Sequence, residues 1–152
     1  MKKSAKPAGI VLVLDYNHGQ NEWEPDPPNE CKIFYRAFLA WRQANCWDNE
    51  IADHVPELFR SAGLVDIETH VQDEIVERGE PDFAERTALW SEVIQNIGSQ
   101  IPAGGFCTQS QLREAQRRYA ITRLARNSKS FADKICSACA LRNIAIYSLA
   151  FC

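Results

Sequence analysis

The chain has 152 residues, of which 45% are hydrophobic and 24% are charged. A chain of this length can form one domain that buries ~70% of its unfolded surface, and this composition excludes a wholly disordered or fibrous protein. The net charge of −3 gives no electrostatic reason to expect a nucleic-acid partner.

The charge is distributed unevenly along the chain. Residues 1–110 carry nine Lys and Arg against eighteen Asp and Glu, a net charge of −9, whereas residues 111–152 carry eight against two, a net charge of +6. A basic run is usually a solvated face, so the basic end is only a weak hint of nucleic-acid binding.

Neither end of the sequence predicts a membrane protein. Lys2 and Lys3 could open a secretory signal, but the apolar run of five residues that follows is shorter than the hydrophobic region of such a signal. Near the other end, Arg142 and Asn143 interrupt the ~20 apolar residues that a bilayer span requires. The six cysteines are irregularly spaced and compatible with reduced thiols, so we expect a cytoplasmic protein.

The first predicted element is a strand over Ile10–Leu14. Pro7 and Gly9 precede these five aliphatic residues, and Asp15 ends the run. Because neighbouring side chains of a strand point to opposite faces, an unbroken apolar run must be covered on both sides. Such coverage is typical of a central strand in a parallel sheet.

Polar residues follow this strand directly. Ligands bind outside the carboxyl ends of the strands in open parallel sheets, so these residues are expected to bind a substrate. They are Asp15, Tyr16, Asn17 and His18. His18 could serve as a base, because the ordinary pKa of histidine lies near neutrality. The alternative is a polar loop that satisfies its own backbone groups.

The proline-rich segment Asn21–Asn29 is predicted to be irregular, since proline supplies no backbone donor. Its position directly after the strand makes it a candidate rim of a binding pocket. Trp23 in this segment could stack on a substrate, or it could anchor the loop to the body of the protein.

Two amphipathic helices and a strand come next. Apolar residues spaced by three and four predict helices over Glu30–Asn45 and over Asp53–Ala62, the second with Asp53 as a candidate N-cap. Gly63 supplies the left-handed residue that ends the second helix. Over Val65–Gln72 the period changes to two, which predicts a strand with one solvated face at the margin of a sheet. The second helix is expected to bury Val55, Leu58, Phe59 and Ala62.

The later part of the chain is predicted to be helical. One helix is expected over Pro81–Ile97, a loop over Ile101–Phe106, and another helix from Thr108 to about Thr122. Thr108 and Gln111 have the spacing of a capping box at the start of that last helix.

Two of these stretches resemble the class I S-adenosylmethionine-dependent methyltransferases. The sequence Lys-Pro-Ala-Gly over residues 6–9, followed by an apolar strand that ends in Asp15, is similar to the fifth strand of these enzymes, with Ala8 in a position where they have Gly. The order helix, Gly63, strand over residues 57–67 is similar to their fifth helix and sixth strand. The resemblance covers about residues 5–122.

This resemblance implies that residues 1–122 form the C-terminal portion of a methyltransferase-like domain, a partial Rossmann-like α/β fold from a doubly wound sheet. It also implies transfer of a methyl group to a small-molecule acceptor, over which the helices after the sixth strand close. The family holds S-adenosylmethionine with a glycine-rich loop after its first strand, and neither that strand nor a G-x-G-x-x-G motif is in this sequence. We therefore expect no cofactor-binding residues here, and no binding of S-adenosylmethionine by this chain alone.

Residues 123–152 form an atypical tail that is basic and rich in cysteine. The stretch Ile144–Phe151 could supply the short final strand, antiparallel to the sheet, that the resemblance implies. The shift in charge and the cysteines could instead indicate an altered reading frame.

The tail also contains Cys136 and Cys139, whose spacing suits a metal or redox pair. A structural zinc site requires four ligands, and the other candidates lie at no matching spacing. They are Cys107, Cys152, His54 and His70. We predict no metal site.

A second hypothesis is a non-catalytic module that associates with another chain through the sheet edge left open by the absent strands. An uncovered edge is a template for association. Either hypothesis therefore predicts a homodimer or a complex with a complementing N-terminal half.

Overall fold

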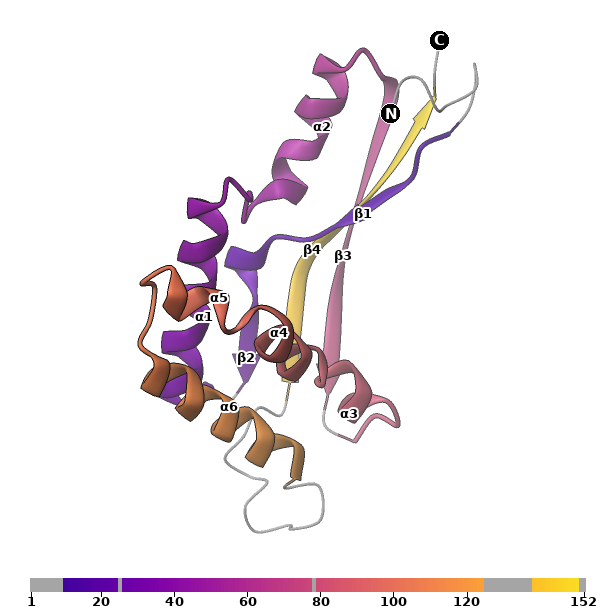
Figure 1. Ribbon diagram of the computed structural model, residues 1–152. Helices are drawn as coiled ribbons and strands as arrows, with labels where there is room; N and C mark the ends of the chain where they lie inside the picture. Colours follow the sequence, from indigo (N-terminus) through magenta and orange to yellow (C-terminus); the bar gives the residue numbers. More distant parts are fainter. Residues whose placement is uncertain (1–9, 25, 78, 125–137, 151–152) are drawn as a thin grey trace. The chain divides into compact units, whose positions relative to one another are not determined.

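The computed structural model describes residues 10–24, 26–77, 79–124 and 138–150 (Figure 1). They form both helices and strands, with more residues in helices. The strands are β1 (Val13–Asp15), β2 (Glu22–Glu24), β3 (Val65–Glu77) and β4 (Ala138–Ala150), and η1 (His18–Gln20) is a short 3-10 helix. The α-helices are α1 (Asn29–Ala44), α2 (Ile51–Ser61), α3 (Phe83–Arg86), α4 (Leu89–Ile97), α5 (Gln100–Ala103) and α6 (Gln109–Leu124).

The chain divides into two compact units, which are described one at a time. Of the described residues, unit 1 takes 10–21, 48–74 and 141–150, and unit 2 takes those within 22–47 and 75–140. Unit 1 contains β1 and α2, and unit 2 contains α1 and the helices from α3 to α6.

Unit 2 has an aromatic core built on α1. The predicted helix over Glu30–Asn45 is confirmed within one residue at each end, and its apolar stripe packs against α5 and α6 (Figure 1). The ring of Trp90 from α4 meets Tyr35 and Phe38 edge-on, with centroids 5.1 and 6.0 Å apart. The buried residues of this cluster are Phe34, Tyr35, Ala37, Phe38, Trp41, Trp90, Ile94, Ile101, Leu112 and Ala115.

The predicted capping box at the start of α6 is confirmed. The backbone N of Thr108 donates to Gln111 Oε1 at 2.7 Å, and the backbone N of Gln111 donates to Thr108 Oγ1 at 3.2 Å. Two amide groups that the helix leaves without intrahelical partners are thereby satisfied.

Unit 1 has a smaller core, in which α2 packs on one face of the neighbouring strands. Its buried residues are Ala52, Val55, Phe59 and Leu64, with Val11, Val13, Ile51 and Ile67 packed against them. Gly63 has φ 75°, so the predicted left-handed end of this helix is confirmed. Three details are wrong: α2 begins at Ile51, ahead of Asp53; Leu58 lies on its outer side, 55% exposed; and Ala62, at its C-terminal end, is exposed as well.

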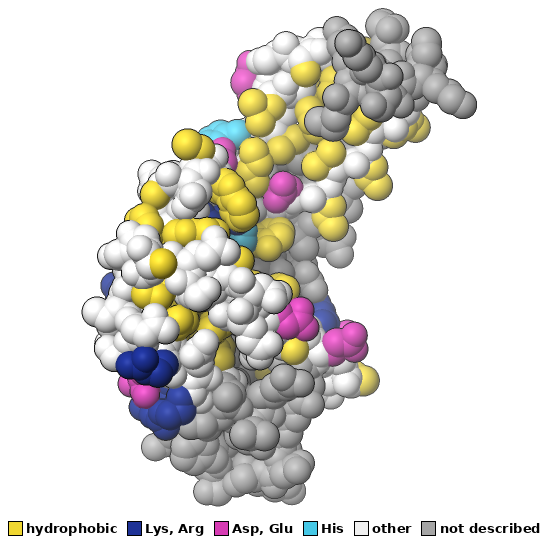
Figure 2. Space-filling model, in the orientation of Figure 1, with side chains coloured by type: hydrophobic (Ala, Val, Ile, Leu, Met, Phe, Trp, Pro, Cys, Tyr) yellow, Lys and Arg dark blue, Asp and Glu magenta, His cyan; other side chains and the backbone are white. Residues whose placement is uncertain are grey.

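The first strand is shorter than the predicted Ile10–Leu14, since β1 begins at Val13 and ends at Asp15. The predicted coverage of both faces of this stretch is also wrong for the described residues. Val11 and Val13 pack against the α2 cluster, whereas Ile10, Leu12 and Leu14 are 73%, 67% and 63% exposed. Figure 2 shows hydrophobic side chains on the surface of the part that contains β1. The alternation arises because α2 covers one face only, and no described element covers the other.

The strands pair around β4. β1 lies antiparallel to β4, with Val13 opposite Tyr147, and β2 lies antiparallel to another length of β4, with Trp23 opposite Cys139. β3 also pairs with β4. Within the described ranges β1 therefore has an antiparallel neighbour in place of the parallel neighbours predicted for it.

Several predicted boundaries need correction. The segment Asn21–Asn29 contains a short strand, β2, because its pairing with β4 supplies backbone partners. The helix predicted over Pro81–Ile97 is two helices, α3 and α4, separated at Thr87, whose hydroxyl donates to the carbonyl O of Phe83. The loop predicted over Ile101–Phe106 is partly helical, since α5 buries Ile101 completely.

The tail contains the long strand β4. β4 includes residues 144–150 of the predicted final strand, while Phe151 and Cys136 lie outside the described residues. No helix in the described part of the chain is long and apolar enough to cross a bilayer.

The core of unit 2 predicts a strong effect of truncating Phe34, which is completely buried. Phe34→Ala is expected to lower the free energy of unfolding by about 3–5 kcal/mol, through lost burial and the cavity left behind. Gln43→Ala, on an exposed position of the same helix, should change it by less than about 0.5 kcal/mol. Urea denaturation followed by circular dichroism measures both, and equal effects would contradict this core.

Candidate functional site

The four consecutive residues predicted to bind a substrate lie at the turn after β1. Asp15 Oδ1 accepts a hydrogen bond from the backbone N of Tyr16 at 2.9 Å. The rings of Tyr16 and His18 are tilted by 58° with centroids 4.6 Å apart, and His18 is buried. The turn is therefore an ordered polar structure in which backbone and side chains contact one another.

Asn17 joins this turn to the start of α2. Its side chain is completely buried, and its Oδ1 accepts a hydrogen bond from the backbone N of Ala52 at 3.0 Å. Ala52 is the second residue of α2, and Glu50, at the N-cap position, makes no side-chain capping bond. Asn17 thus caps this helix from a distant position in the sequence. The backbone N of His18 adds a second connection, donating to Asn49 O at 2.8 Å.

The other polar atom of Asn17 has no partner in the part of the chain that the structure describes. Nδ2 is buried and makes no hydrogen bond there. A buried donor without an acceptor costs about 1–3 kcal/mol. Nδ2 is therefore a place where an acceptor atom of a ligand, or a water molecule, would be bound favourably.

A carboxylate just before α2 meets a histidine in the first turn of this helix. Asp48 Oδ2 lies 2.5 Å from Nδ1 of His54, and Oδ1 of the same carboxylate accepts from the backbone N of Glu50 at 2.8 Å. The hydrogen bond to Asp48 raises the pKa of His54, and the charges of Asp48, Glu50 and Asp53 act in the same direction. From the sequence His54 is a candidate only as a metal ligand, and this pair is not predicted. The one sequence signal for the pair is that Asp48 precedes His54 by six residues, with the start of α2 between them.

Trp23, the fifth predicted site residue, lies in unit 2. Its ring meets Tyr35 edge-on at 4.9 Å and lies 6.4 Å from Trp90. These contacts agree with the interpretation of Trp23 as an anchor of its segment. Its role in substrate binding stays a prediction.

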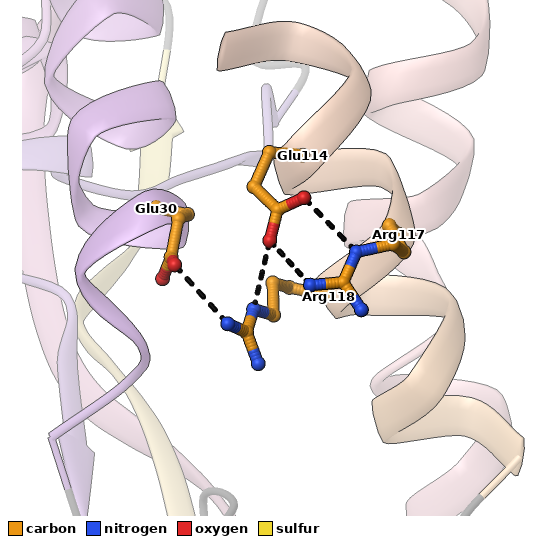
Figure 3. Close-up of polar contacts among 4 residues, drawn as sticks. All are labelled: Glu30, Glu114, Arg117 and Arg118. Carbon is orange, nitrogen blue, oxygen red and sulfur yellow. Dashed lines mark hydrogen bonds and ion pairs between the residues drawn. The ribbon is translucent and has the colours of Figure 1, made fainter. Parts of the chain in front are cut away.

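A second polar group, also missed from the sequence, connects α6 with α1 (Figure 3). Arg118 donates to Glu114 on its own helix at 3.1 Å and to Glu30 on α1 at 3.2 Å. Arg117 also donates to Glu114, and this hydrogen bond is the main reason that the pKa of Glu114 is lowered. Each of the four residues has an oppositely charged partner in this group, and the pair of Arg118 and Glu30 connects the two helices.

Two of the described cysteines, Cys31 and Cys107, have thiols whose pKa is raised by burial. Burial and the charge of Glu30 raise the pKa of Cys31 to about 11, so its thiol is protonated at neutral pH. Burial also raises the pKa of Cys107. Among the described residues no group of three or more His, Cys, Asp or Glu side chains could hold a metal ion.

Comparison with known proteins assigns no family. No protein-family model matches the chain, and no curated protein matches it.

The bond between Asn17 and α2 gives a stability prediction. Asn17→Ala removes the acceptor of the Ala52 backbone N, so it is expected to lower the free energy of unfolding by about 1–2 kcal/mol. Asn96→Ala, at an exposed position on α4, is the control and should cost less than about 0.5 kcal/mol. Matching urea midpoints for the two variants would show that Asn17 is not a cap.

The pair of Asp48 and His54 gives a prediction for pH. Because the pKa of His54 is raised in the folded chain, the pair stabilises the fold fully below about pH 6.5, the ordinary value, and loses this effect as the pH rises through the raised pKa. Asp48→Asn should therefore destabilise the chain more at pH 5.5 than at pH 9 when unfolding is measured by urea at both values. A loss that is the same at both values, or larger at pH 9, would contradict the pairing.

Proposed function

We propose that this chain is the C-terminal portion of a class I S-adenosylmethionine-dependent methyltransferase-like domain. In this proposal a further stretch of polypeptide supplies the cofactor-binding half. The complete domain has a doubly wound, Rossmann-like fold and transfers a methyl group to a small-molecule acceptor. The chain by itself is inactive.

The observation that carries the proposal is the uneven coverage of residues 10–14, of which the last two belong to β1. Five consecutive aliphatic residues suit a strand with layers on both sides, yet Ile10, Leu12 and Leu14 remain largely exposed on one face. A sequence of this kind is expected where a second layer covers that face. The proposed missing half provides that layer.

The order of elements in unit 1 supports the proposal as well. Within unit 1, β1 and η1 come before α2, which is followed by Gly63 in a left-handed conformation and then by β3; β2 and α1 of unit 2 lie between η1 and α2 in the sequence. β4 is antiparallel to β1 and also pairs with β3. This order agrees with the strand, helix, glycine and strand of the resemblance, and with its antiparallel final strand.

The residues at hand do not fit the cofactor. The family binds S-adenosylmethionine after strands that this sequence does not contain, and the adjacent glycines here, Gly104 and Gly105, follow the short helix α5. What the chain offers is the acceptor side, at the carboxyl end of β1. In this proposal Asp15, Tyr16, Asn17 and His18, at the turn after β1, are the candidate contacts of the acceptor molecule.

The exposed face of β1 also favours a second candidate function. A non-catalytic module could use the same apolar residues, together with the edge of β1 that pairs with no described strand, to bind a second copy of this chain. The DNA immediately upstream distinguishes the two functions. A frame that encodes a strand followed by a glycine-rich loop supports the methyltransferase, whereas an unrelated neighbour supports the module.

Titration with S-adenosylmethionine tests the proposed function. Calorimetry on this chain alone is expected to show no binding up to about 1 mM ligand, whereas the chain joined to the upstream-encoded half should bind with a Kd of ~1 μM. Leu12→Asp in the joined protein should abolish binding, because a charge on the covered face prevents assembly. Leu58→Asp is the matched control, since Leu58 is similarly exposed but lies on the outer side of α2. Micromolar binding by the chain alone would refute the proposal.

A further inference from the structure

The strand β3 has one strand neighbour, β4, among the described residues. It runs over 13 residues, from Val65 to Glu77, whereas strands of globular proteins usually have about 3–10. An edge without a neighbouring strand presents a row of backbone donors and acceptors, and natural proteins keep such edges short or cover them. The length of β3 therefore points to a partner along its other edge.

Contacts at the end of β3 show which of its backbone groups face that edge. The carbonyl O of Ile75 accepts a hydrogen bond from Arg86 Nη2 at 3.3 Å. Two residues later, the backbone N of Glu77 donates to Glu80 Oε2 at 3.1 Å, and Glu77 O accepts from the backbone N of Glu80 at 3.2 Å. These groups bond to the segment after β3, so they point away from β4.

The same edge is uncovered farther back along β3. The N–H and C=O of a strand residue point to the same side, and successive residues alternate, so the backbone groups of Thr69 and Val71 face the same way as those of Ile75. No described strand lies on that side. Asp66 has φ 52°, so the regular edge begins after it. Residues 67–73 thus offer a docking edge about 20 Å long.

The side chains of β3 indicate which partner fits this edge. The strand contains five Asp and Glu residues and no Lys or Arg. On one face the side chain of Glu68 is 70% exposed. On the other face, where Ile67 packs against the α2 cluster, Val71 is 63% exposed. Because the side chains of an added strand lie beside those of β3 on both faces, a basic residue next to Glu68 and an apolar residue next to Val71 are favoured.

We propose that β3 binds, along the edge that faces away from β4, an extended segment of another protein in which basic and apolar residues alternate. The segment adds a strand to the sheet through backbone hydrogen bonds to Thr69 and Val71. A second copy of β3 is disfavoured at this edge, because it would bring the carboxylates of both strands together. The docking edge belongs to β3, so it does not depend on the methyltransferase proposal, which concerns β1.

Amide hydrogen exchange of the full chain tests the position of the added strand. The probe is a synthetic peptide of alternating Lys and Val residues. At saturating peptide the backbone amides of Thr69 and Val71 are expected to exchange at least about tenfold more slowly, whereas those of Glu68 and His70, which face β4, should change little. Slowing at Glu68 and His70 alone, or at none of the four, would overturn the proposal. Slowing that needs no peptide and increases with protein concentration would also overturn it, because the partner would then be a second copy.

Charge reversal tests the chemistry of the partner. In a titration with the labelled peptide, Glu68→Lys is expected to weaken binding about fivefold or more. Glu92→Lys is the matched control, since it changes the net charge equally at an exposed position of α4, and should stay within about twofold of the wild type. Equal effects of the two substitutions would show a general attraction to an acidic chain and overturn the proposal.

Proline at the edge tests the backbone contacts. Val71→Pro removes an N–H that faces away from β4, so the circular dichroism spectrum should be unchanged while the affinity for the peptide falls about tenfold or more. Undiminished binding by this variant would contradict the added strand. If Val71→Pro loses strand content, the exchange and charge-reversal measurements decide the question, because both leave the backbone of β3 intact.

Discussion

The packing of β1 against α2 is the interaction on which the rest of unit 1 depends. Val11 and Val13 face the helix, and the alternation of a strand then turns Ile10, Leu12 and Leu14 away from it. Complete burial of an aliphatic side chain stabilises a fold by about 1.5–3 kcal/mol, so three such residues left mostly exposed represent several kcal/mol of stabilisation not realised in this chain. Contiguous apolar surface of this kind marks a site of association.

The same packing positions the polar residues. β1 ends at Asp15, and the turn that follows reaches the start of α2, where Asn17 satisfies the backbone N of Ala52. The segment that enters α2 also carries Asp48 and His54. Asn17 Nδ2, a buried donor with no partner among the described residues, therefore lies just after β1. The His54 imidazole, with Asp48 as its partner, lies at the start of α2. The fold explains how residues distant in the sequence come to be joined by hydrogen bonds at the end of β1 and the start of α2.

Much of the helical structure could be predicted from the sequence, because it depends on local spacing. The apolar stripe of α1, the capping box at Thr108 and the left-handed Gly63 are local signals, and each is confirmed. The exposure of Ile10, Leu12 and Leu14 could not be predicted. An apolar run indicates that both faces of a strand need to be covered, but it does not show which elements cover them. The distant cap by Asn17 and the pair of Asp48 and His54 also escaped prediction, because both depend on contacts that the linear sequence does not encode in a regular period.

The central claim is that the exposed face of β1 is covered when the domain is complete. Alkylation of a Leu12→Cys variant, read at the level of single peptides by mass spectrometry, measures this coverage directly. We expect the introduced thiol to react rapidly in this chain alone and at least about tenfold more slowly once the chain is joined to the upstream-encoded half, as burial blocks access. An unchanged rate in the joined protein would contradict the account.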